Sequence, residues 1–213
     1  DGTTATGYLD SPESIEAITW LRDLVLEAGV APDPSTLDQM LQQAGFLDRF
    51  LAGDVAMFDR GHWELVGLQS NALYEPGIFG VVGQPTKVNN ATILYESGFV
   101  IRADIEESKK LAACQFVEAA TSRAYQDTKA LTGIAISANQ EAADAAAAAS
   151  DSPIEAAFVE AVASGRAPYG SVYSKWPTIE TLLDSLMERV LAGGEVQAEV
   201  AATVEEINRE LSR

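Results

Sequence analysis

The chain has 213 residues, with a hydrophobic content of 47% and a charged content of 22%, values typical of one large or two small globular domains. Its formal net charge of −18 excludes nucleic acid and anionic lipid as main partners, because so acidic a surface repels phosphate groups. One histidine and one cysteine exclude an internal disulfide and a His-rich metal site, so we expect no metal and no cofactor.

Helices are predicted at the start of the chain. Residues 11–13 read Ser-Pro-Glu, which supplies an N-cap, a proline at the first helical position and an acid in the first turn. Apolar residues then recur at helical spacing until Gly29 ends the helix. A second helix is predicted over residues 37–52, although Gly45 weakens it midway.

Short apolar runs predict strands in the middle of the chain. They cover residues 55–58, 78–82, 91–95 and 99–101. Between the first two, the chain turns at Gly61 and presents Trp63 at the start of a short helix that reaches about Ala72. An indole at such a strand-to-helix turn lies where α/β proteins place their ligands.

The second half of the chain is predicted to be almost entirely helical. Residues 142–149 are alanine-rich and favour helix, and Ser152-Pro153-Ile154-Glu155 is a capping box that begins the next one. Many helices with few strands favour an α/β or α+β architecture. The predicted helices cover residues 104–120, 122–131, 142–149, 153–164, 177–191 and 195–211.

The segment around Trp63 resembles the extracellular solute-binding proteins of carbohydrate ABC transporters (family 1, maltodextrin-binding-like). In that family a helix ending in Phe-x-x-Gly leads to a strand with Ala-Met and then to Gly-x-Trp, whose tryptophan stacks on a sugar ring. The matching residues here are Phe50, Gly53, Ala56, Met57, Gly61 and Trp63.

The likeness extends over nearly the whole chain, and what supports it is the order in which the motifs occur along the sequence. Residues 7–13 are similar to the start of the family's second lobe, residues 97–113 to its return crossing, and Trp176 to a late aromatic that lines the sugar site. The resemblance implies an α/β, type II periplasmic-binding-protein-like fold, helix-rich with few strands, of which this chain is the C-terminal portion. It divides the chain into a second-lobe part (1–94), a crossover segment that packs on the first lobe (95–147) and second-lobe C-terminal helices (148–213).

Trp63 and Trp176 are the main candidate ligand-binding residues, and we expect them to face one shared cleft. A flat indole desolvates the apolar face of a sugar ring, although either tryptophan is also compatible with a place in the core. Hydroxyl groups both donate and accept hydrogen bonds, so cationic, acidic and phenolic side chains suit the rest of such a site. The candidates of this kind are Arg60, Tyr95, Glu96 and Tyr173, each of which is otherwise an ordinary surface residue.

The resemblance implies the substrate-binding component of an ABC importer, which closes two lobes around a neutral mono- or oligosaccharide and delivers it to permease subunits. It implies an extracellular or periplasmic location, with the membrane reached only through the permease or through a lipid anchor outside this chain. With half of the protein missing, we expect weak or absent sugar affinity. We also expect an apolar face that includes Leu111, Phe116 and Val117. It should lead either to self-association or to a rearrangement that packs this segment against the rest of the chain.

No catalytic residue is predicted, because the sequence holds no nucleophile elbow and no phosphate-binding glycine loop. With 32 acidic residues, chance pairs of carboxylates abound and none stands out as a glycosidase pair. A fragment of a glycan-active hydrolase and a helical interaction module remain the alternatives, and sequence upstream of Asp1 would discriminate between them and a transport protein.

Overall fold

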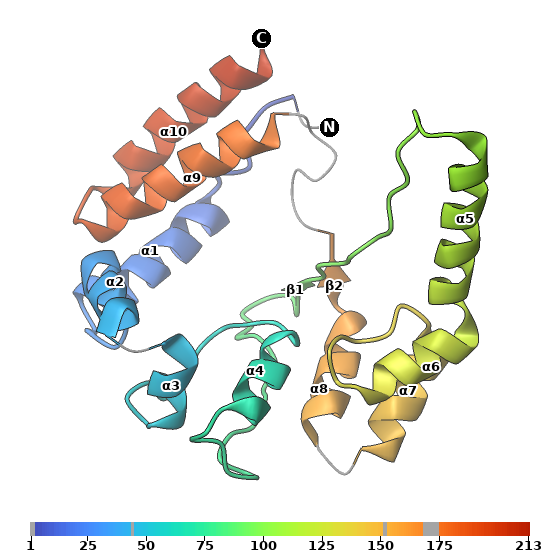
Figure 1. The fold of residues 1–213 in the computed structure, drawn as a ribbon. Helices are drawn as coiled ribbons and strands as arrows, with labels where there is room; N and C mark the ends of the chain where they lie inside the picture. Colours follow the sequence, from blue (N-terminus) through green and yellow to red (C-terminus); the bar gives the residue numbers. More distant parts are fainter. Residues whose placement is uncertain (1–2, 44, 151–152, 168–174) are drawn as a thin grey trace. The chain divides into compact units, whose positions relative to one another are not determined.

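The structure is a computed structural model that describes residues 3–43, 45–150, 153–167 and 175–213 (Figure 1). The described residues form ten α-helices and two short strands, which agrees with the predicted excess of helix over strand. None of these helices combines the length and the apolar character that a membrane span requires. The helices are α1 Pro12–Leu26, α2 Pro34–Gln43, α3 Phe46–Leu51, α4 Glu64–Ser70, α5 Glu107–Thr121, α6 Arg123–Leu131, α7 Gln140–Ala149, α8 Pro153–Val162, α9 Trp176–Leu191 and α10 Val196–Leu211, and the strands are β1 Thr92–Ile93 and β2 Gly165–Arg166.

The chain divides into two compact units. The first joins Asp1–Gly45 to Tyr169–Arg213 and contains α1, α2, α9 and α10. The second is Phe46–Pro168, which contains the remaining helices and both strands. The assignment of residues 1–94, 95–147 and 148–213 to lobes and crossover stays a prediction.

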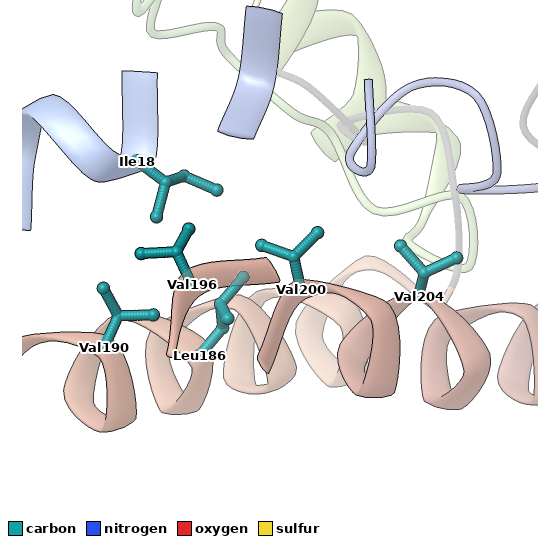
Figure 2. Close-up of a cluster of buried hydrophobic side chains, with 6 residues drawn as sticks. All are labelled: Ile18, Leu186, Val190, Val196, Val200 and Val204. Atoms are coloured by element: carbon teal, nitrogen blue, oxygen red, sulfur yellow. The ribbon is translucent and has the colours of Figure 1, made fainter. Parts of the chain in front are cut away.

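The core of the first unit lies between α1, α9 and α10 (Figure 2). Residues four apart on a helix share one face, and α10 therefore presents Val196, Val200 and Val204 together to this core. Leu186 of α9 lies among them with only 1% of its surface exposed. The buried cluster consists of Ile18, Leu186, Val190, Val196, Val200 and Val204.

Polar contacts fix α10 against its neighbours in this unit. The guanidinium of Arg189 on α9 donates to the Glu199 carboxylate at 2.6 Å and to the Thr203 hydroxyl at 2.9 Å. Towards the end of α10, the Asn208 side-chain oxygen accepts a hydrogen bond from the Ala5 amide at 2.7 Å. The chain's first described residues are thus tied to its last helix.

Side-chain caps begin α1, α2 and α10 of the first unit; at α10 the Glu195 carboxylate accepts from the Ala198 amide at 2.9 Å. The predicted N-cap of α1 is confirmed, since the Ser11 hydroxyl accepts from the Ser14 amide at 3.2 Å. Before α2, the Asp33 carboxylate accepts from the Thr36 hydroxyl at 2.6 Å and from the Thr36 amide at 3.1 Å. These bonds stabilise the ionised form and lower the pKa of Asp33 from its ordinary value.

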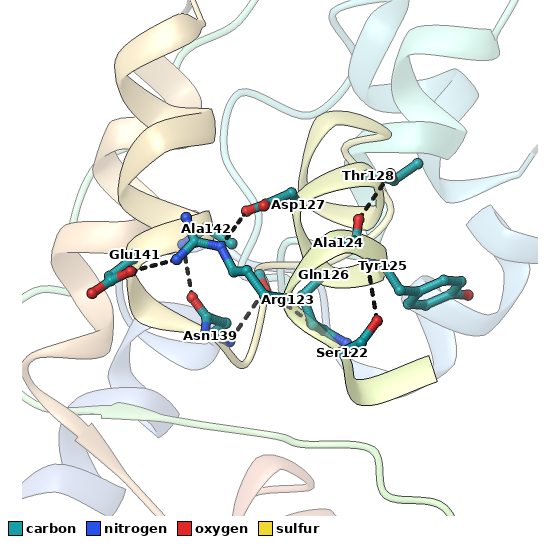
Figure 3. Close-up of polar contacts among 11 residues, drawn as sticks. Ser122, Arg123, Ala124, Tyr125, Gln126, Asp127, Thr128, Asn139, Glu141 and Ala142 are labelled. Carbon is teal, nitrogen blue, oxygen red and sulfur yellow. Dashed lines mark hydrogen bonds and ion pairs between the residues drawn. The ribbon is translucent and has the colours of Figure 1, made fainter. Parts of the chain in front are cut away.

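In the second unit, polar contacts join α6 to α7 (Figure 3). Arg123 pairs with Asp127 on its own helix at 2.6 Å and with Glu141 at the start of α7. Beneath this ion pair, the buried Gln126 side chain accepts from the Ser137 hydroxyl at 2.9 Å. The start of α7 and the segment that leads to it are therefore tied to α6 by directional bonds.

The apolar core of the second unit is built on Leu51, Leu65 and Leu68, from α3 and α4. Phe58 packs against it, edge-on to the Phe50 ring with 4.6 Å between ring centroids. Strands β1 and β2 pair in parallel, with Thr92 opposite Gly165. This small sheet joins two parts of the unit that lie far apart in the sequence.

Most of the predicted strands are wrong. Residues 55–58, 78–82 and 99–101 have no strand partner in the described part of the chain, and residues 91–95 form a strand only at Thr92–Ile93. Phe58 and Phe79 of these runs do pack against the core, but from irregular backbone. Val82 and Val100 are 86% and 94% exposed. An apolar run becomes a strand only where another strand supplies its hydrogen bonds.

The prediction of a single helix over residues 37–52 is also wrong. Helix α2 ends at Gln43 and α3 begins at Phe46, with Gly45 between them outside both helices. Glycine costs about 1 kcal/mol relative to alanine inside a helix. The weak point seen in the sequence is therefore where the helix divides.

Exposed apolar side chains gather on α5 and on the segment before it. Leu111 and Phe116 are 63% and 62% exposed, and Phe116 meets the ring of Phe99 edge-on at 5.7 Å between centroids. Val117 is half-buried. The apolar face that we predicted for this helix is thus largely open.

We expect Leu186→Ala to lower the free energy of unfolding by about 2–5 kcal/mol, since it leaves a cavity at the centre of the first unit. The control is Leu21→Ala on α1, where the side chain is 43% exposed and truncation should cost about 0.5 kcal/mol. Urea unfolding followed by circular dichroism measures both changes. Equal losses for the two variants would contradict the position of the core.

Candidate functional site

Trp63 lies at the start of α4, where the sequence predicted it. Two backbone hydrogen bonds form the turn, from the Glu64 amide to the Gly61 carbonyl at 3.2 Å and from the Leu65 amide to the His62 carbonyl at 3.0 Å. Leu65 points into the core and is 3% exposed, whereas Trp63 is 53% exposed. The turn therefore buries one side of the helix start and leaves the indole in solvent.

Gly61 is part of the same arrangement. A Cβ atom added to Gly61 would lie 2.0 Å from Cζ3 of the Trp63 indole, far inside van der Waals contact. The indole thus lies directly against the Gly61 backbone, and no other residue type fits there without moving it. This gives the Gly-x-Trp spacing a physical reason.

Tyr95 is the second predicted residue that the structure brings to this place. Its ring lies edge-on to the Trp63 indole, with 5.9 Å between centroids and 80° between planes, a favourable geometry for aromatic pairs. Tyr95 is 60% exposed and follows strand β1 directly. Trp63 and Tyr95 form an exposed pair, which we call the aromatic platform.

Arg60 and Glu96 are close to the platform residues in the sequence. The Arg60 guanidinium lies 5.2 Å from the centre of the Phe46 ring, and its Nε lies 3.7 Å from Oε1 of Glu64. Glu96 follows Tyr95 in the chain, is exposed, and belongs to none of the ion pairs among the described residues. The roles of Arg60 and Glu96 at the site stay predictions.

Trp176 belongs to the other compact unit, where it is the first residue of α9 and is half-buried. The preceding Lys175 ammonium donates to the Glu210 carbonyl near the end of α10. Whether Trp176 and Trp63 share a cleft stays a prediction. Tyr173, the last predicted site residue, lies outside the described residues.

His62 has a partner that the sequence did not predict. It is 7% exposed, and its Nε2 lies 2.8 Å from Oε2 of Glu155 on α8. Its ring meets Phe158 edge-on at 5.1 Å between centroids. From the sequence, Glu155 was interpreted as part of a capping box, whose Ser152 lies outside the described residues. Nothing in the intervening sequence signals its contact with His62.

The site offers an aromatic surface more than an enclosed pocket. A cavity of about 520 Å³ lies nearby, lined by residues 50–53, 55–56 and 78–80, and Trp63 is not among its lining residues. Within the described ranges, no group of three histidine, cysteine or acidic side chains is placed to hold a metal ion. The chemistry that this arrangement supports best is the stacking of a flat, partly apolar molecule on an indole.

Comparison with known proteins gives a family and a fold. A family model described as bacterial extracellular solute-binding protein matches residues 1–176. The structure is similar to an ABC substrate-binding protein from Listeria monocytogenes solved in complex with cycloalternan, with a TM-score of 0.79 and 23% sequence identity. The similarity covers 99% of this chain and 52% of that one, so this chain spans about half the length of its structural neighbour. No curated protein matches the chain.

We expect Gly61→Ala to displace the Trp63 indole, because the new methyl group and the ring cannot occupy the same space. The matched control is Gly80→Ala, where an added Cβ meets nothing within 4 Å. Tryptophan fluorescence in a Trp20→Phe, Trp176→Phe background reports on Trp63 alone. The emission should change in the Gly61 variant and stay the same in the Gly80 variant, and an unchanged spectrum in both would contradict the contact.

Proposed function

Because the chain belongs to the bacterial extracellular solute-binding proteins, we propose that it is part of the substrate-binding component of an ABC importer. Its solute is a neutral mono- or oligosaccharide, which it delivers to the permease subunits. It carries out no catalysis. It reaches the membrane only through the permease or through a lipid anchor outside this chain.

The observation that carries this proposal is the aromatic platform. Half of the Trp63 indole is exposed although it is held against Gly61 and Tyr95. A large aromatic ring left in solvent on an ordered turn favours a ligand with an apolar face, such as the C–H face of a sugar ring. Arg60 and Glu96 supply a donor and an acceptor for the hydroxyl groups around that face.

The charge of the chain supports a neutral solute. A net charge of −18 disfavours an anionic ligand over the whole surface. The Listeria neighbour was solved with cycloalternan, a carbohydrate, and its fold is shared by this chain. Trp176, the first residue of α9, is a further candidate contact for the solute.

The test is a titration of the chain with neutral mono- and oligosaccharides, cycloalternan included, followed through the three indole N–H signals in an NMR spectrum. Single tryptophan-to-phenylalanine variants assign the signals. NMR detects weak binding, which suits a chain that spans half of its structural neighbour. We expect the Trp63 signal to move on addition of at least one carbohydrate.

Trp20 is the matched control for this titration, since it is 52% exposed against 53% for Trp63. Its signal should stay in place. Trp63→Ala should raise the Kd at least about tenfold, equivalent to about 1.4 kcal/mol, whereas Trp20→Ala should leave it unchanged. A Trp63 signal that no carbohydrate of the panel moves, or equal effects of the two substitutions, would contradict the proposal.

We also propose that the open apolar face of α5 drives self-association of this chain. Light scattering should give an apparent mass that rises with protein concentration, and the double variant Leu111→Asp, Phe116→Asp should abolish the rise. The control is Val30→Asp, at a position that is 73% exposed in the other unit. A monomer over the whole concentration range would refute the proposal.

A further inference from the structure

Among the described residues, the His62 side chain makes one hydrogen bond, to Glu155. With the Glu155 carboxylate as acceptor, Nε2 carries a proton and donates it over 2.8 Å. The other ring nitrogen, Nδ1, is buried and has no hydrogen-bond partner among the described residues. The orientation of the imidazole therefore depends on Glu155 and on the edge-on contact with Phe158.

Glu155 comes from a helix that is itself fixed in the core. Its neighbours on α8, Ile154 and Phe158, both pack against the cluster of Leu51, Leu65 and Leu68. A hydrogen bond to a charged carboxylate is stronger than one between neutral groups. The bond thus ties the residue that precedes Trp63 to a rigid support.

The same helix leads to the position of Tyr95. After α8 the chain turns, with the Ser164 amide donating to the Ala161 carbonyl at 3.0 Å, and enters β2. The Arg166 carbonyl on β2 accepts from the Leu94 amide at 2.8 Å, one residue before Tyr95. A Cβ atom on Gly165 would lie 3.2 Å from that of Leu94, so the two backbones approach closely here.

We propose that the His62–Glu155 pair is a positioning pair. It places the Trp63 indole beside Tyr95, whose own position is fixed by the pairing of β1 with β2. The positions of both rings of the aromatic platform then depend on one part of the chain, α8 and the strand β2 that follows it. The importance of the pair for ligand binding rests on the proposed function. Its effect on the geometry of the two rings does not.

The first experiment measures the platform without any sugar. Nuclear Overhauser contacts between the Trp63 and Tyr95 rings are recorded for the wild-type chain, Glu155→Ala, Glu155→Gln and Glu160→Ala. The amide oxygen of glutamine still accepts from Nε2, and Glu160 is an exposed carboxylate on the same helix. We expect the ring contacts to be lost in Glu155→Ala and kept in the other two variants, with the same helix content by circular dichroism in all four.

His62→Gln supplies a second test in case Glu155→Ala does not fold. The glutamine amide N–H takes the place of Nε2–H, so the contacts between the Trp63 and Tyr95 rings should persist in this variant. They should be lost in His62→Leu, which has no N–H to donate to the Glu155 carboxylate. Ring contacts that survive without an acceptor at residue 155, or that are lost in Glu155→Gln, would overturn the proposal.

The second experiment titrates the same variants with the carbohydrate that moves the Trp63 signal most. Glu155→Ala should raise the Kd about tenfold, and Glu155→Gln and Glu160→Ala should leave it near the wild-type value. If the wild-type chain binds no carbohydrate, while Glu155→Ala still abolishes the contacts between the Trp63 and Tyr95 rings, the proposed function is refuted and the positioning role of the pair stands. Wild-type affinity in Glu155→Ala overturns the role of the pair in binding.

Discussion

The contact between the Trp63 indole and the backbone of Gly61 is the constraint on which the site depends. An exposed tryptophan on a loop ordinarily samples several rotamers, and ordering it on ligand binding costs free energy. Here the absence of a side chain at Gly61 lets the ring lie 2.0 Å from where a Cβ would be. The ring therefore lies against Gly61 in the chain without ligand, and about half of its surface stays open to solvent.

The surroundings of this contact come from distant parts of the sequence. Tyr95 reaches the indole because β1 pairs with β2, and His62 reaches Glu155 across 93 residues of chain. Both contacts start from α8 or the strand that follows it. A short helix packed on the core of the second unit thus connects to the residue before Trp63 and to the residue before Tyr95.

The sequence predicted what local chemistry determines. Ser11 was predicted as the N-cap of α1, and helices were predicted over residues 122–131 and 195–211, where α6 and α10 lie, because capping and helical spacing act within a few residues. The strands at residues 55–58 and 78–82 were wrong, because a strand depends on a distant partner that an apolar run does not reveal. Trp63 and Tyr95 were each predicted as site residues, but their contact was not, and the His62–Glu155 pair was missed entirely. The family resemblance is confirmed by the match over residues 1–176.

The measurement that tests this account most directly is the proton chemical shift of the two Gly61 Hα atoms in the wild-type chain. An indole that lies against Gly61 shields these protons by its ring current, so the account predicts strong upfield shifts that disappear in Trp63→Leu. Shifts near those of an unstructured glycine, unchanged in Trp63→Leu, would show that the ring does not lie there and would contradict the description of the site.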